Sequence, residues 1–533
     1  MASDHRSSDN WFKTDVKYEG EAYAELISPE IKAEGSAEIL FSESGESTII
    51  MKLENIIFQG NPIGPEIREF LSRKDLTVPE YAKLSKYLRQ IENNRCSKFV
   101  VKTKEGNFLS EGVGNILYYN NDSYLIFSFL KSQFTTSNEL QPKYWVLPLL
   151  NFVSEFSQGS PRLEHPLRIN SLDDRVIKFE FDKQIAFIEP LPDYSDRKEH
   201  LYNGIGKNKI TSVMVGELGD NSIELENLGK WFPFGFLGVL GVATGSEVSA
   251  SWIEFRSQDG HLVRRVHPSL RVPCFFRGHV AIDELFNIGI GSLLTNFQSI
   301  SDHLDPLKEL YFTAAMENLI KGGLYDLTSE DKLSYIFRGL DGLCEKYNLK
   351  ANDLRTELEP EQKDKVERIV NDAIELAETR LSSLEKEVRS EGKEHQGDNI
   401  NAILRKMKQN QPYFDTSYGR AVVRLLHKFH LNDAEVVESY YESNPRWDRR
   451  KWIQVLPYYR GKTMHSGYFK FHENANYRED VPRISNHLHD ILLRIILKML
   501  DYKGTYHSTV KRIKSTDNVD WVLQDTKASE LGY

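Results

Sequence analysis

The chain has 533 residues, of which 40% are apolar and 27% charged, and this balance excludes a mainly disordered protein. The length predicts two or more domains, because single hydrophobic cores stop growing at roughly 250–300 residues. The net charge of −10 disfavours a protein that coats nucleic acid with its whole surface, yet residues 441–533 hold 16 Lys and Arg against 11 Asp and Glu, so an anionic partner is expected to meet this end.

The first 300 residues are predicted to be rich in β-strands. Apolar and polar residues alternate over residues 49–54, and Lys98–Thr103 is a β-branched run beside the turn signal Glu105-Gly106. Further candidate strands have the same character: Ile116–Tyr119, Tyr124–Leu130, Tyr144–Leu150, Val176–Phe181, Ile210–Val215, Ile223–Leu228 and Val248–Phe255. One helix is expected from Pro79 to Ile91. Short strands at this density favour an antiparallel sandwich-like fold or a pair of β modules in residues 1–300.

After about residue 300 the apolar spacing changes to the helical period. Leu307–Ile320 predicts one helix, and Ser329 is expected to cap a second that runs towards Tyr347. Glu361–Arg389 predicts an amphipathic helix with a solvated outer face, followed by a polar break over Ser390–Gly397. Further helices are expected near Asp415, after Asn432, from Pro457 to Gly467 and from Pro482 to about Gly504. The fold class is therefore α+β and multidomain, with an all-α bundle in residues 301–533.

The cysteines and the apolar runs indicate a soluble cytoplasmic protein. Cys96, Cys274 and Cys344 lie too far apart for a disulfide framework or a tetrahedral zinc set, so we expect three buried thiols in a reducing compartment. The N-terminus lacks the apolar stretch of a signal peptide. The most apolar run, Ile491–Leu500, is short and carries charge, so it is expected to be a core helix and not a membrane span.

Motifs for nucleotide, metal and hydrolase sites are missing. Gly461-Lys462-Thr463 has the ending of a phosphate-binding loop, but Leu456 stands where its first glycine belongs. The lone GxG at Gly289 and Gly291 is expected to form a turn or bulge. The glycines at 235, 238, 241 and 245 indicate tight packing or strand kinks. No cofactor and no metal are therefore expected, which weighs against an NTPase, a zinc hydrolase and an α/β-hydrolase.

One segment combines positive charge, aromatic rings and histidine. It runs from Arg446 to Phe469 and contains Trp447, Trp452, Tyr458 and Tyr459 among basic residues. Basic side chains contact phosphates and aromatic rings stack on bases, so this composition suits nucleic acid. The alternative is a basic helix surface beside a Trp and Tyr core edge.

Within this segment, Arg460 is followed after four residues by His465 and then by Ser466-Gly467. This pattern resembles the signature of the HEPN ribonucleases, which is an Arg, four to six residues and a His, often with Gly close behind. The order of a β-rich N-terminal part and a helical C-terminal part is similar to the ApeA-like branch, whose members act in bacterial anti-phage defence. The resemblance implies a sensor domain in residues 1–300, a HEPN domain in residues 301–533 and a homodimer.

The chain also departs from the family and offers competing pairs. Gly461 follows Arg460 where the family usually has Asn, Asp or His, so the polar group that orients the site is missing there. Six pairs have a His five to seven positions after an Arg: Arg256/His261, Arg389/His395, Arg420/His427, Arg424/His430, Arg460/His465 and Arg483/His489. The basic surroundings, the position near the chain end and the trailing Ser-Gly favour 460/465, with 483/489 second.

The chemistry that the resemblance implies is cleavage of RNA without a metal. The 2′-hydroxyl of RNA is the nucleophile, His465 moves protons near neutral pH, and Arg460 stabilises the charge on the phosphorane. Tyr459 and Lys462 are secondary candidates for contacts with bases or phosphates. The leading hypothesis is an endoribonuclease that acts as an abortive-infection effector, with an unknown infection trigger. The alternative is a non-catalytic binding or scaffold protein with a β recognition domain and a helical dimerisation bundle.

Overall fold

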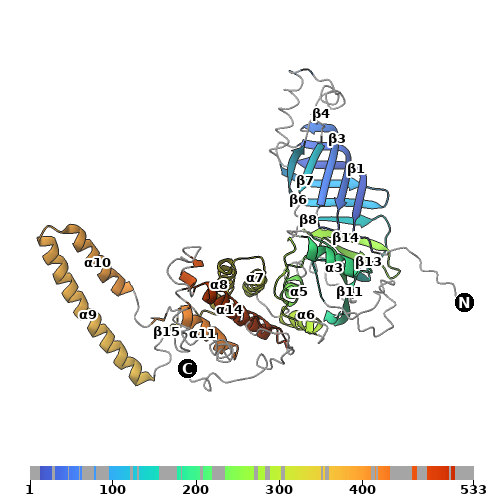
Figure 1. Cartoon of the computed structure of the whole chain (residues 1–533). Helices are drawn as coiled ribbons and strands as arrows, with labels where there is room; N and C mark the ends of the chain where they lie inside the picture. Colours follow the sequence, from blue (N-terminus) through green and yellow to red (C-terminus); the bar gives the residue numbers. More distant parts are fainter. Residues whose placement is uncertain are drawn as a thin grey trace.

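A computed structural model of the whole chain shows a β-rich half followed by a helical half (Figure 1). The structure describes residues 12–26, 31–45, 47–58, 61–62, 77, 79, 95–119, 124–128, 131–154, 177–181, 183–204, 208–218, 235–268, 274–282, 289–301, 306–349, 352–353, 359–409, 414–415, 418–431, 456, 459–461, 463–464, 477–502 and 506–509. The strand predicted at 223–228, nearly all of the helix predicted at 79–91 and the helix predicted after Asn432 lie outside these residues.

Six antiparallel strands of the described chain close into a ring. They are β1 (Val16–Leu26), β2 (Ile31–Phe41), β3 (Ser47–Phe58), β7 (Tyr124–Ser128), β6 (Gly106–Tyr119) and β5 (Arg95–Lys102), in this order around the ring. β5 pairs with β1 and β3 pairs with β7, which completes the circle, while β4 (Asn61–Pro62) extends the edge of β3. Alternate residues of β1 are buried, among them Tyr18, Ala22 and Ala24. Because side chains on a strand alternate between two faces, this pattern fills one face of the ring with apolar groups.

The ring continues into an open antiparallel sheet. From β6 the hydrogen-bonded order is β8 (Lys131–Thr136), β14 (Leu262–Pro268), β13 (Ile253–Arg256), β9 (Tyr144–Leu150), β12 (Ile210–Glu217), β11 (Gln184–Pro190) and β10 (Ile177–Phe181). The strands expected at 98–103, 116–119, 144–150 and 210–215 are confirmed. The sandwich-like arrangement is corrected, since the described strands form one continuous 14-stranded sheet.

Strand β9 lies between two hydrophobic cores. Trp145, Leu147 and Leu149 belong to the core shared with the helices, whereas Val146 and Leu150 belong to a second core that the ring strands share with β9 and β12. Every residue of β9 is therefore buried, as expected for a central strand that is covered on both faces.

A buried ionic network ties the ring to the open sheet. Glu254 on β13 is fully buried and accepts hydrogen bonds from Arg256 Nε (2.8 Å) and Arg265 Nη2 (2.8 Å). Arg265 also donates to the hydroxyl of Tyr18 on β1 at 2.7 Å. Burial acts to raise the pKa of Glu254, but the two guanidinium groups outweigh it and hold the pKa below its usual value.

Three helices cover the open sheet: α3 (Tyr194–Asn203), α5 (Leu237–Thr244) and α6 (Gly289–Ser301). The glycines of α5 lie in a buried helix rather than in a strand. A Cβ atom at Gly241 would come within 2.6 Å of Ile320, so the close approach of α5 to α7 requires the small residue. The turn expected at Gly289 and Gly291 is corrected, because both residues begin α6. A Cβ at Gly291 would lie 2.1 Å from the carbonyl oxygen of Lys178 on β10, so this glycine allows the helix to lie against the sheet.

The helical half contains α7 (Pro306–Gly323), α8 (Ser329–Lys346), α9 (Pro360–Ser390), α10 (Glu394–Gln409), α11 (Tyr418–Lys428) and α14 (Tyr477–Met499), with a short pair β15 (Asn352–Asp353) and β16 (Phe414–Asp415). The cap of α8 is Thr328, whose hydroxyl accepts from the Asp331 amide, and not Ser329. Pro482 lies inside α14, which begins five residues before it at Tyr477. The predicted amphipathic helix 361–389 is confirmed as α9, which pairs with α10 and projects away from the rest of the chain (Figure 1).

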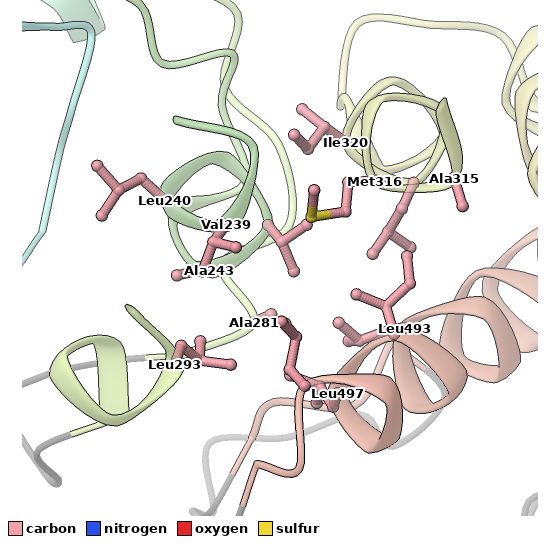
Figure 2. Close-up of a cluster of buried hydrophobic side chains, with 14 of the residues drawn as sticks. Val239, Leu240, Ala243, Ala281, Leu293, Ala315, Met316, Ile320, Leu493 and Leu497 are labelled. Atoms are coloured by element: carbon pink, nitrogen blue, oxygen red, sulfur yellow. The ribbon is translucent and has the colours of Figure 1, made fainter. Parts of the chain in front are cut away.

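One hydrophobic core joins the two halves. Figure 2 shows Val239 and Ala243 of α5 facing Met316 and Ile320 of α7, with Leu493 of α14 beside them. The boundary expected near residue 300 coincides with the end of α6, and the core continues across it. The predicted core helix at 491–500 is confirmed, since Ile491–Leu497 are all buried.

None of the described helices has the length and apolar composition that a bilayer crossing requires. Cys344 is buried as expected, but Cys274 is exposed, which corrects the expectation of three buried thiols.

Candidate functional site

Arg460 is held by groups from two helices. Its Nε and Nη2 atoms donate to Oδ2 of Asp341 on α8 at 3.1 and 2.6 Å. The guanidinium carbon lies 4.8 Å from the centre of the Tyr418 ring, which begins α11. Burial acts to lower the pKa of Arg460, but the hydrogen bonds and the charge of Asp341 outweigh it and raise the pKa above its usual value. Arg460 is therefore a permanent, oriented cation.

One edge of this guanidinium remains open. The Arg460 side chain is 33% exposed and that of Asp341 is 16% exposed. Within the described part of the chain, Nη1 of Arg460 has no hydrogen-bond partner. A guanidinium fixed at one edge and free at the other can bind an anion without first paying the full loss of side-chain entropy. The arrangement fits a phosphate contact.

The arginines of two competing pairs, Arg256 and Arg389, do not offer such an edge. Nε, Nη1 and Nη2 of Arg256 all donate, to Glu254 and to the carbonyl oxygen of Gly260. The same three atoms of Arg389 each donate to a different carboxylate. Arg424 donates through Nε and Nη2 to the carbonyl oxygen of Leu349. The structure therefore distinguishes Arg460 from the Arg256 and Arg389 pairs, which the sequence pattern does not.

The segment around Arg460 lies along α8 in the opposite direction. Arg460 meets Asp341, and Met464 Sδ lies 3.9 Å from Oγ of Ser334, seven residues earlier on α8. Residues 459–461 and 463–464 are helical, as expected for the short helix at 457–467. His465 and Lys462 lie outside the described residues. The side chain of Tyr459 is buried in the core shared by both halves, so the expected contact with a base does not fit its position.

Gly461 has open space around it in the described part of the chain. Apart from its chain neighbours and the backbone of its own helix, no described atom lies within 4 Å of the position where its Cβ would be. Close packing therefore gives no reason for glycine after Arg460. A polar side chain, as the HEPN pattern usually has there, would fit without a clash.

The runner-up histidine, His489, lies in a different place. It is buried in the wall of a cavity of about 580 Å³, and its Nε2 donates to the carbonyl oxygen of Leu319 at 3.2 Å. Burial, together with the nearby His279, lowers the pKa of His489 to about 3. A histidine that stays neutral at pH 7 with its Nε2 proton engaged does not suit acid–base catalysis.

Sequence reasoning missed this cavity. Its wall takes residues from α3, from the segment 274–282, from the ends of α7 and α8, from α14 and from residues 506–509. The histidines of the wall are 210 positions apart in the sequence, at 279 and 489, although their ring centres are only 5.6 Å apart. No local motif links such distant positions, so no sequence signal could have found the site.

Metal ligands and known relatives give no further assignment. Among the described residues, no three His, Cys, Asp or Glu side chains come close enough together to hold a metal ion. Comparison with known proteins found no matching family model, no similar curated protein and no similar solved structure.

Proposed function

We propose that the protein is a metal-independent endoribonuclease in which Arg460 and His465 act on RNA. The observation that carries the proposal is the guanidinium of Arg460, which Asp341 fixes at one edge while Nη1 has no hydrogen-bond partner among the described residues. The free edge would bind the scissile phosphate and stabilise the phosphorane, and His465 would exchange protons with the 2′-hydroxyl and the leaving oxygen. The basic, aromatic surroundings of residues 446–469 add support.

The wider biological role rests on the resemblance to the ApeA-like HEPN proteins. The β-rich half would sense an infection signal and the helical half would cleave RNA, as an abortive-infection effector in the cytoplasm. We also propose a homodimer, in which a second copy completes the site around Arg460 across a two-fold axis. Light scattering of the purified chain would test the dimer, and a monomer at micromolar concentration would contradict it.

A binding or scaffold role is the second candidate. The ion pair between Arg460 and Asp341 joins the segment 459–464 to α8, and this contact stabilises the helical half whether or not RNA is cleaved. If the protein is a scaffold, the ion pair between Arg460 and Asp341 has a structural role only. The two functions therefore differ in what happens to RNA when Arg460 or His465 is replaced in a protein that still folds.

The test is incubation of the purified chain with RNA in excess EDTA. We expect cleavage by the wild type, and a loss of about 100-fold or more for His465→Ala, because a general acid–base group contributes roughly 10²–10⁴-fold. His395→Ala is a matched control, since His395 is exposed and belongs to another Arg–His pair. Equal cleavage by all three proteins, or cleavage that EDTA abolishes, would refute the proposal. If the resting enzyme is silent, growth arrest on expression that Arg460→Ala fails to relieve would do the same.

A further inference from the structure

We propose that the cavity between the two halves binds a phosphate-bearing small molecule of mononucleotide size. The inference does not depend on ribonuclease activity, because it concerns a different set of residues. The cavity has a volume of about 580 Å³, within the range of roughly 300–1,000 Å³ that small-molecule sites occupy. The cavity brings together residues that are far apart in the sequence. They come from the segments that cover the sheet and from α8 and α14.

The described charged side chains that line the cavity are positive, whereas the chain as a whole is negative. Arg277 and Lys332 line the cavity, whereas none of the described Asp and Glu residues does, in a protein with a net charge of −10. Within the described residues, neither cation has an ion pair; Arg277 lies over the ring of Tyr202 at 4.8 Å. Partial burial lowers the pKa of Lys332 despite the opposing effect of Asp326. Two cations without carboxylate partners in one hollow form a site for an anion.

The imidazole rings of His279 and His489 lie in the wall of the cavity, and each has one ring nitrogen that can accept a hydrogen bond. Nε2 of His279 contacts the carbonyl oxygen of His507 at 2.6 Å, as Nε2 of His489 contacts that of Leu319. A carbonyl oxygen only accepts, so both Nε2 atoms carry the proton, and in the neutral rings each Nδ1 is an acceptor. Nδ1 of His489 is buried and has no partner within the described residues. A ligand that donates an N–H or O–H to this atom would satisfy it, and because the atom has almost no exposed surface, the lining must shift for the ligand to reach it.

The combination indicates a ligand with two different ends. Its phosphate end would meet Arg277 and Lys332, and its other end would donate to the buried imidazole. The exposed ring of Tyr325 adds flat apolar surface to the wall, against which a planar base can stack. A nucleoside monophosphate has all three features, whereas inorganic phosphate has neither a second end nor a planar base.

The experiment is titration calorimetry on the full chain with AMP, CMP, GMP and UMP in turn, with inorganic phosphate and with adenosine. We expect at least one nucleotide to bind one site per chain, and adenosine to bind far more weakly. Lys332→Gln and Arg277→Gln should each weaken that nucleotide at least about tenfold, since a hydrogen bond to a charged group contributes roughly 1.5–3 kcal/mol. Arg338→Gln is the matched control, because it removes a cation from the same helix α8 outside the cavity, and it should bind as the wild type does.

Three results would overturn the proposal. The first is no binding of any of the four nucleotides to a wild type whose thermal unfolding is cooperative. The second is equal nucleotide affinity in the wild type, Lys332→Gln and Arg277→Gln. The third is binding of a ten-nucleotide RNA far more tightly than its mononucleotides with the same dependence on Lys332, which would make the hollow part of an RNA groove.

Discussion

The ion pair between Asp341 and Arg460 allows the proposed role of Arg460 to be tested by a double-mutant cycle. Two N–H groups of the guanidinium donate to one carboxylate oxygen, at 3.1 and 2.6 Å. Charges about 4 Å apart attract by about 4 kcal/mol at an effective dielectric constant near 20. Desolvation of both groups opposes this attraction, and the 33% exposure of Arg460 lets water screen it. We expect a coupling energy of about 1–2 kcal/mol.

The cycle compares Asp341→Ala, Arg460→Ala and the double variant with the wild type. Each single change leaves a partly buried charge without its partner and should lower stability by about 2 kcal/mol, which lowers the melting temperature by about 4–8 °C for a unit of 150–250 residues. The double variant should lose less than the sum, by the coupling energy. Lys143 and Glu217 form the control cycle, since both side chains are more than a third exposed and their coupling should stay below about 0.5 kcal/mol.

The same variants connect stability with function. If Asp341 orients Arg460, then Asp341→Asn should lower kcat for RNA more than it raises KM, because positioning acts in the transition state. A coupling energy as small as that of the control pair would refute the reasoning. It would mean that Asp341 does not fix the guanidinium, and that Arg460 is not the oriented cation that the proposed phosphate contact requires.

Three further changes have outcomes that the structure sets. Glu254→Gln should destabilise the β-rich half by about 3 kcal/mol, since two buried arginines lose their carboxylate; an unchanged melting temperature would contradict this. His489 has a pKa of about 3 when folded against 6.5 in the unfolded chain, so the unfolded chain binds more protons as the pH falls from 7. Stability should therefore decline from about pH 6.5 towards pH 3, by about 2 kcal/mol at pH 5, and His489→Gln should lose this part of the slope in melting curves. Gly245→Ala and Gly392→Ala both place a side chain at positive φ, 68° and 76°. Only the first also meets a backbone oxygen, 2.2 Å away, so its melting temperature should fall further; equal losses would contradict this.

The local elements of the fold could be predicted because their signals are local. Tyr144–Leu150 was recognised as a strand from its β-branched and aromatic run, and α9 from apolar residues at helical spacing. The turn or bulge predicted at Gly289 and Gly291 is wrong, because both glycines lie in α6, whereas tight packing, one of the two alternatives for the glycines at 235–245, is confirmed at Gly241. The sheet and α7 explain these glycines, and both contacts come from distant parts of the chain.

The sequence by itself therefore determined the α+β class and the positions of most described strands and helices, and Arg460 as the leading arginine stays a prediction. Only the tertiary structure decided that β3 and β7 close a ring, that one core crosses residue 300, and that Asp341 holds Arg460 from 119 residues away. It also decided the cavity, which joins Arg277, Lys332 and His489. The physical reason is that hydrogen bonds, ion pairs and close packing act through space, whereas periodicity and caps act between neighbours along the chain.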